Sequence, residues 1–549
     1  MNFKNLIAPQ PLPFEYEEWK NKPFNERVVM LCRAWAVQGY GAPVAVYFFY
    51  IIKIAFYVGM WIWFCSFSNG LGSLDTIKNW WFETEAIGKA VCWSMLFETL
   101  GMGCGSGPLT ARYFPPFGAA FHFLRPGTIK LPLFPAVFKS DNRNWFDVLL
   151  YLAFVVLLLR ALVSAELTPL LLLPVILILP ILTLIDKTIF ISARGEHYYL
   201  VLCCFLFPVD TIAATKLVWL AIWIWAATSK LNRHFPTVIG VMVSNSALLR
   251  IPWLRKKMYV NYPSDLRPSK LSAFLAHFGT LVEYIFPVLL LFGDGGQLTL
   301  IALAIMFVFH LYITSSVPMA VPLEWNIIMV YGGFALFGNH AMVWAFDVHS
   351  LLLITLLFVG LILLPVLGNL FPKWISFLVS MRYYAGNWAY SVWLFKKGTE
   401  EKLDEHIVKC TPTVIRQLNL FYDEQTTFSL ISKVIAFRSM HLHGRILQQV
   451  VPKMVETIDD YVWRDGELVA GVTLGWNFGD GHIHNEQLLH AIQKRCHFQS
   501  GELRCLFVEA QPMFQPNLSW RIVDAKDGKL EKGESCVKEL EQLQPWCCG

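Results

Sequence analysis

Long apolar stretches are the feature that most constrains how this chain can fold. A helix needs about 20 predominantly apolar residues to cross the hydrocarbon core of a membrane. Candidate segments lie at 42–67, 86–104, 146–164, 167–185, 197–214, 216–230, 272–293, 298–317, 325–346 and 350–371. Hydrophobic residues make up 55% of the chain and charged residues only 15%, which excludes an ordinary soluble protein. We therefore predict an all-α, multi-pass membrane bundle of about ten transmembrane helices.

The composition changes after the last apolar stretch, at Phe371. From Lys373 onward the charge content is that of a soluble protein, and stretches such as ELRCLFVEAQPM have the residue types of strands. We predict three parts, which are a cytoplasmic N-terminal segment (1–41), a transmembrane helical domain (42–372) and a small cytosolic α+β domain (373–549).

Basic residues predict the orientation of the bundle. The loop from Lys230 to Lys270 carries eight Lys or Arg residues against the single acidic residue Asp265, and basic loops favour the cytoplasmic side. Ten crossings then place both termini in the cytoplasm. The N-terminus lacks the basic start and short apolar core of a secretory signal. We expect a protein of the bacterial inner (plasma) membrane with cytoplasmic N- and C-termini.

Ionisable residues inside the predicted spans are candidates for a functional site, because charge within a bilayer is costly. Lys230 ends one apolar segment, Glu283 lies inside the next, and His310 lies late in the one after. An amine acts as a base only when its pKa is lowered toward neutrality, as burial does. Two alternatives stay open, because Lys230 could snorkel to the lipid headgroups or pair with Glu283, which would keep the amine charged.

The order of Lys230-Leu231, Glu283 and His310 in successive segments resembles the membrane region of the vitamin K-dependent gamma-carboxylase-like, or horizontally transferred transmembrane, superfamily. The resemblance covers roughly residues 200–370. It implies that Lys230 is a catalytic base acting on a reduced quinone, with His310 assisting and Glu283 beside them. The peptide-binding lumenal region of the carboxylase has no counterpart here. Taken whole, the chain looks like an uncharacterised bacterial multi-pass membrane family with a soluble C-terminal domain.

Four further polar residues are candidates for binding a substrate. Glu98 lies within an apolar segment, and Arg125 lies in the stretch FPPFGAAFHFLRPG, whose aromatic residues are typical of a membrane interface. Glu324 and Asn326 open the ninth apolar segment. Because the first turn of a helix favours an acidic side chain, Glu324 could instead serve the helix dipole. We expect Lys230, Glu324 and His310 to line one pocket near the cytoplasmic face.

Histidines in the predicted C-terminal domain are weak candidates for a metal site. They are the pair His441 and His443 and the pair His482 and His484, the latter beside Asp480. Alternate residues on a strand point to one face, but four ligands at a diagnostic spacing are lacking. We therefore expect no metal and read them as solvated loop residues.

Two classes of function fit these observations. The first is an enzyme acting on a lipid-soluble, quinone- or isoprenoid-like substrate, with Lys230 as base and a quinone as the cofactor that the resemblance suggests. The second is a non-catalytic protein that binds lipid or pigment, or an accessory subunit that docks a partner protein or a second copy of itself. Membrane lipids are partners in either case. No nucleotide motif occurs, and a basic loop at a membrane face indicates anionic lipid rather than nucleic acid.

Overall fold

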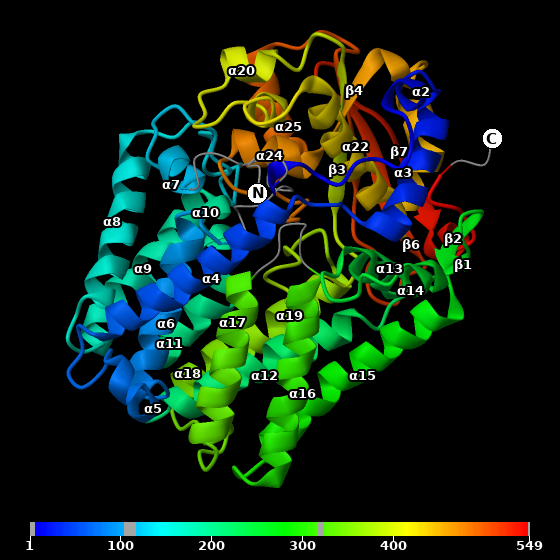
Figure 1. The fold of residues 1–549 in the computed structure, drawn as a ribbon. Helices are drawn as coiled ribbons and strands as arrows, with labels where there is room; N and C mark the ends of the chain where they lie inside the picture. The colour runs from blue at the N-terminus through cyan, green and yellow to red at the C-terminus, as the bar shows by residue number, and fades with distance from the viewer. Residues whose placement is uncertain (1–5, 104–116, 317–322, 547–549) are drawn as a thin grey trace.

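A computed structural model describes residues 6–103, 117–316 and 323–546 of the chain. Apolar helices occupy the left and lower parts of Figure 1, and a five-stranded sheet with its own helices lies at the upper right. The turn between α15 and α16 lies at the bottom of this view, at the end of the molecule away from the sheet.

Six helices in the described ranges are long and apolar enough to cross a membrane. They are α4 (Val44–Cys65), α8 (Trp145–Leu162), α12 (Thr211–Ser229), α15 (Lys270–Phe292), α16 (Gln297–Ser315) and the run Leu351–Leu370, which comprises α18 (Leu351–Phe358), a π-helical turn and α19 (Leu364–Leu370). Their outer faces are apolar, as contact with lipid requires. On α4, for example, Ile51 and Ile52 are 63% and 66% exposed.

The other four predicted spans form shorter or broken helices, so ten spanning helices are not confirmed. They correspond to α6 (Thr84–Thr99), α9 (Pro169–Ile185), α11 (Leu200–Cys204) and α17 (Leu323–Gly332), the last continued by a π-helical stretch, Gly333–Asn339. The helix α6 is buried along almost its whole length. It is apolar because protein surrounds it, and an apolar run read from sequence cannot distinguish protein from lipid surroundings.

Shorter elements connect the long helices. They are α2 (Tyr16–Lys20), α3 (Phe24–Gln38), α5 (Ile77–Trp80), α7 (Gly118–Phe123), α10 (Lys187–Ser192), α13 (Phe235–Asn245), α14 (Pro252–Lys257) and the hairpin of β1 (Tyr259–Asn261) and β2 (Asp265–Pro268). The basic loop that follows α12 therefore contains folded structure, and Figure 1 places α13, α14 and the hairpin beside the sheet.

The C-terminal part is an α+β unit built on an antiparallel sheet of strand order β4-β3-β5-β6-β7. The strands are β3 (Tyr390–Lys396), β4 (Tyr461–Asp465), β5 (Leu503–Val508), β6 (Asn517–Asp524) and β7 (Gly528–Cys536). The helices are α20 (Lys402–His406), α21 (Val414–Leu418), α22 (Glu424–Met440), α23 (Leu447–Met454), α24 (Gly466–Thr473), α25 (Glu486–Cys496) and α26 (Val537–Leu540).

The core under this sheet includes residues from distant parts of the chain. Trp19 and Trp35 from the N-terminal segment pack in it with Val238 of α13 and Phe437 of α22. The Lys433 ammonium on α22 donates a hydrogen bond to the carbonyl of Tyr40, at 3.0 Å. The division of the chain into 1–41, 42–372 and 373–549 stays a prediction, and the core shows that packing is continuous across these boundaries.

Candidate functional site

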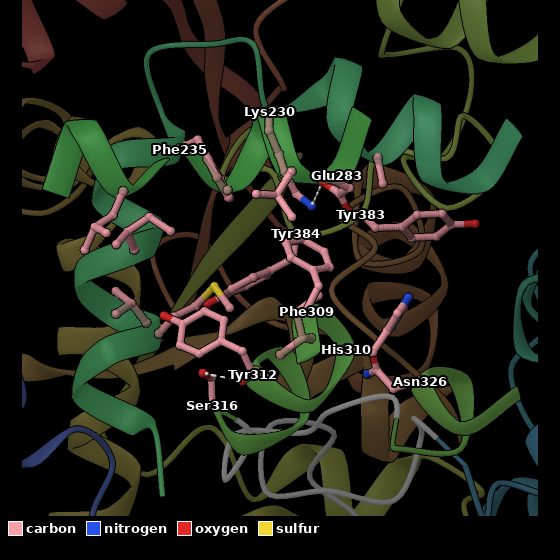
Figure 2. A pocket seen from close by; sticks show the side chains of 18 of the residues that line it. Lys230, Phe235, Glu283, Phe309, His310, Tyr312, Ser316, Asn326, Tyr383 and Tyr384 are labelled. Atoms are coloured by element: carbon pink, nitrogen blue, oxygen red, sulfur yellow. Dashed lines mark hydrogen bonds and ion pairs between the residues drawn. The ribbon is translucent and has the colours of Figure 1, made fainter. Parts of the chain in front are cut away.

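A cavity of about 1050 Å³ lies between the membrane helices and the C-terminal part. Its walls come mainly from α12, α13, α15, α16 and the segments around Tyr383, Phe437 and Phe478. Most of the lining is apolar. Figure 2 labels Lys230, Phe235, Glu283, Phe309, His310, Tyr312, Ser316, Asn326, Tyr383 and Tyr384 around this space. Its size is at the upper end of the range for small-molecule sites.

Lys230 directly follows the last turn of α12 and points into this cavity (Figure 2). Its side chain is only 9% exposed and forms an ion pair with Glu283 of α15. The rings of Phe235 and Phe309 lie 5.5 and 5.8 Å from the ammonium nitrogen. Lys230 therefore faces the protein interior rather than the lipid headgroups.

His310 on α16 is held by hydrogen bonds at both ring nitrogens. The Trp223 indole N–H donates to Nε2 at 3.0 Å, and Nδ1 lies 2.8 Å from Oδ1 of Asn326. A neutral ring that carries its proton on Nδ1 satisfies both partners. Sequence reasoning missed Trp223. The signal was its spacing, because Trp223 precedes Lys230 by two helical turns and shares its helix face.

The four residues predicted to bind substrate fall into three places. Asn326 lines the cavity. Glu98 and Glu324 are buried outside its lining, where Glu324 pairs with Lys53 at 3.0 Å and shares a side-chain hydrogen bond with Glu98. Arg125 is exposed, and its Nη1 donates to the carbonyl of Lys409 at 2.6 Å. The structure therefore brings Lys230, Glu283, His310 and Asn326 together and leaves the other three candidates apart.

Arg194 forms part of the wall near α17, and sequence reasoning missed it. Its guanidinium lies 4.1 Å from the centroid of the Trp325 ring, and its Nε donates to Glu196 at 2.8 Å. The Tyr383 ring packs against the Trp325 ring, and the two ring centroids lie 4.5 Å apart. Arg194 lies between two apolar segments and resembles an ordinary loop residue. No sequence pattern therefore indicates that it lines the cavity.

Glu467 belongs to the wall that comes from the C-terminal part. It lies on α24, and the guanidinium of Arg438 binds both Glu467 and Asp465, at 3.2 and 2.9 Å. Burial raises the pKa of Glu467 to about 7, although Arg438 opposes the shift. No pattern in the sequence marks Glu467 as a neighbour of the membrane helices.

The histidines considered for a metal site are not solvated loop residues as predicted, because His441, His443 and His484 are buried and contact neighbouring protein atoms. Nδ1 of His441, His443 and His484 lies 2.7 Å from the Phe437 carbonyl, the Gly386 carbonyl and the Ser391 hydroxyl respectively. Burial lowers the pKa of His441 to about 3. His482 lies 3.4 Å from Glu509 and 3.8 Å from Asp480. In the ranges that the structure covers, no group of three or more His, Cys, Asp or Glu residues could hold a metal ion.

A family model described as "Transmembrane protein of unknown function (DUF3556)" matches residues 3–549, which include both the membrane helices and the C-terminal sheet. No curated protein matches the chain, and no solved structure matches it. The matching model is not that of the carboxylase-like superfamily.

Proposed function

The chain belongs to the DUF3556 family of transmembrane proteins of unknown function, and on this premise we propose that it binds a lipid-soluble amphiphile in the cavity beside Lys230. The observation that carries the proposal is the cavity itself. It measures about 1050 Å³ and is mostly apolar, yet a buried ion pair and a hydrogen-bonded His–Asn pair lie on its wall. Apolar walls with a few placed polar groups are typical of a ligand site.

The route into the cavity supports a ligand that comes from the bilayer. Phe278 on α15 and Val308 on α16 both line the cavity, and both are also more than half exposed, at 53% and 62%. These residues lie on helices long enough to span a membrane. The edge of the cavity thus meets the lipid-facing surface, where a molecule dissolved in lipid can enter.

The polar groups would orient the head of the ligand. The Lys230 ammonium can donate to an oxygen of the ligand while Glu283 continues to neutralise its charge. His310 and Asn326 lie on the same wall, where both ring nitrogens of His310 are already engaged by Trp223 and Asn326. Because these groups lie among apolar side chains, a ligand that leaves its own polar head unpaired would be disfavoured.

Lipid extraction and mass spectrometry of the purified protein test the proposal. Gly279 lines the cavity, and a Cβ atom added there meets no atom within 4 Å. Gly59 on α4 is equally unobstructed and does not line the cavity. We expect the wild type and Gly59→Phe to retain the same small molecule, and Gly279→Phe to lose it without loss of fold. Equal retention by both variants would refute a ligand in this cavity.

A second candidate function is an enzyme with Lys230 as general base on a quinone- or isoprenoid-like substrate. The observation in its favour is that Lys230 faces the cavity from a buried position, whereas its ion pair with Glu283 is the alternative that argues against a base. His310 is less suited to assist, because both of its ring nitrogens already have partners. Lys230→Arg, which cannot lose its proton at accessible pH, should bind ligand and abolish turnover.

We also propose the bacterial inner membrane as the location, with both termini in the cytoplasm. The basic residues of the loop after α12 support this orientation. That loop lies beside the C-terminal sheet, so both would face the same side. A partner protein or a second copy of the chain remains part of the proposal for an accessory role.

A further inference from the structure

The segment Leu248–Lys257, here called the basic segment, projects large apolar side chains outward. It consists of the short helix α14 and the residues just before it. Leu248 and Trp253 are each 65% exposed, and Ile251 is 40% exposed. A group of large exposed apolar side chains within one short segment indicates contact with a membrane or a partner.

Three cations lie among these apolar side chains. Arg250, Lys256 and Lys257 are exposed, and in the described part of the chain none of them forms an ion pair with a carboxylate. Arg233 and Arg267 of the same loop, by contrast, each have an acidic partner. The charge of the basic segment is therefore available to an anion from outside the protein.

The basic segment lies where two helices that are long enough to span a membrane begin and end. The N–H of Ala247 donates to the carbonyl of Ser315, the last residue of α16, at 2.7 Å. The hydroxyl of Ser269, the residue before α15, donates to the carbonyl of Lys257 at 2.6 Å. Figure 1 shows α14 close to the end of α15 that lies nearer the sheet. At this level a bilayer presents its headgroups.

A buried arginine fixes the shape of the basic segment. The guanidinium of Arg255 donates to the carbonyls of Val37, Ser246 and Leu249, at 2.7, 2.9 and 3.0 Å. Leu249 and Leu254 point the other way and line the cavity. The outward side chains are therefore presented by a backbone that is held on its inner side.

The chemistry of the outer side chains fits the headgroups of anionic lipids. Tryptophan is enriched where the hydrocarbon of a bilayer meets the headgroups, and apolar side chains with Lys or Arg beside them are typical of segments that lie in this interface. Exposed cations at that level attract lipids with a net negative charge. An acidic protein partner would pair with the cations, but the ends of α15 and α16 place the segment against lipid.

We propose that the basic segment is a docking site for anionic lipids of the leaflet next to the sheet. Trp253 and its apolar neighbours enter the interface, and Arg250, Lys256 and Lys257 bind the lipid phosphates. The inference goes beyond the proposed function, because it concerns the outer surface and requires no ligand in the cavity.

The first test uses the full-length protein in nanodiscs with equal amounts of phosphatidylglycerol and phosphatidylcholine that carry the same acyl chains. Native mass spectrometry counts the lipids that stay bound. We expect the wild type to retain phosphatidylglycerol roughly tenfold better at low salt, since one to two cations at an anionic surface give a factor of this order. The triple variant Arg250→Gln/Lys256→Gln/Lys257→Gln should lose most of that preference.

A charge-matched control removes three exposed cations from β7 and the turn before it. The variant Lys526→Gln/Lys529→Gln/Lys532→Gln should keep the wild-type preference. Equal retention of both lipids by the wild type, or equal loss in both triple variants, would reject the site. Gly279→Phe should also keep the preference, and its loss there would assign the preference to the cavity instead.

The second test measures whether the basic segment touches the bilayer. A nitroxide label on Trp253→Cys should be reached better by oxygen, which concentrates in lipid, than by a water-soluble nickel complex, after subtraction of the signal from labelled wild type. Leu530 on β7 is 47% exposed, and a label on Leu530→Cys should show the reverse. A label at position 253 that behaved like the one at position 530 would overturn the proposal.

Discussion

At the scale of single residues, the ion pair between Lys230 and Glu283 decides how the cavity can be tested. Removing Lys230 alone leaves a buried carboxylate without its partner, and breaking a buried pair in this way costs about 3–5 kcal/mol. The variant Lys230→Met is therefore expected to impair folding as well as function. A substitution that removes both charges avoids this ambiguity.

The first prediction concerns this pair. We expect the double variant Lys230→Met/Glu283→Gln to fold with an unfolding temperature near that of the wild type and to lose the bound ligand, because the charged anchor is gone. Lys230→Arg should keep the ligand, since the guanidinium can still pair with Glu283. Thermal unfolding in detergent and mass spectrometry of bound lipid measure the two effects. Ligand retained by the double variant would exclude Lys230 from the site.

The second prediction concerns the pH dependence that Glu467 introduces. Its pKa is raised from 4.5 to about 7 by burial, against Arg438 and with Asp465 adding to the shift. The folded state thus binds the proton more tightly than the unfolded state, and the stability from this group declines as pH rises from about 4.5 through 7. Relative to the wild type, Glu467→Gln should have a similar unfolding temperature at pH 5 and a higher one at pH 8. The exposed Glu405→Gln should show no such difference between the two pH values.

At the scale of elements, the sequence predicts best the bounds of the helices that face lipid. The helices α4, α8, α15 and α16 begin and end within a few residues of the predicted spans, because an outward apolar face requires a long uninterrupted run. Shorter segments give weaker signals. The stretch YVWRDGELVAGVTLGW has residue types typical of strands, yet residues 466–473 form the helix α24, and no sequence pattern marks β3 (Tyr390–Lys396) as a strand. Buried on both faces, β3 lacks the alternation that identifies strands.

The residues of the candidate site can likewise be predicted only in part from the sequence. Lys230, Glu283 and His310 stand out because charge and imidazole are rare in apolar runs. Trp388 and Glu467 lie in a region of ordinary composition, and only the tertiary structure brings them to the cavity. Their contribution depends on long-range packing that no local pattern records.

The third prediction tests how α3 is anchored. Trp19, which precedes α3, is 1% exposed, and its ring packs 5.6 Å from Phe428 on α22. Replacing a buried tryptophan by alanine costs about 3–5 kcal/mol. We expect Trp19→Ala to lower the unfolding temperature by several degrees and to make the N-terminal segment sensitive to protease. The control Leu420→Ala, at a position that is 68% exposed, should have little effect on either measurement.

At the scale of the whole molecule, the arrangement of the helices makes a prediction about orientation in the membrane. The turn between α15 and α16 lies at the end of the molecule opposite the sheet (Figure 1). Reporter tags inserted at Gly296 and Ser350 should therefore report the outer side, and tags at Lys257 and Lys397 the cytoplasm. A tag at Lys257 that reported the outer side would overturn the assignment based on basic residues.

The shared core of α3, α13, α22 and the sheet also has a consequence for biosynthesis. The ribosome releases α3 before the first membrane helix and β7 after the last one. Until the sheet is complete, Trp19 and Trp35 lack most of the apolar surface that buries them in the finished protein. A nascent chain must therefore keep its N-terminal helices unassembled throughout insertion into the membrane. Chains that stop before β5 would present these tryptophans to chaperones and proteases, and cells should degrade them rather than accumulate them.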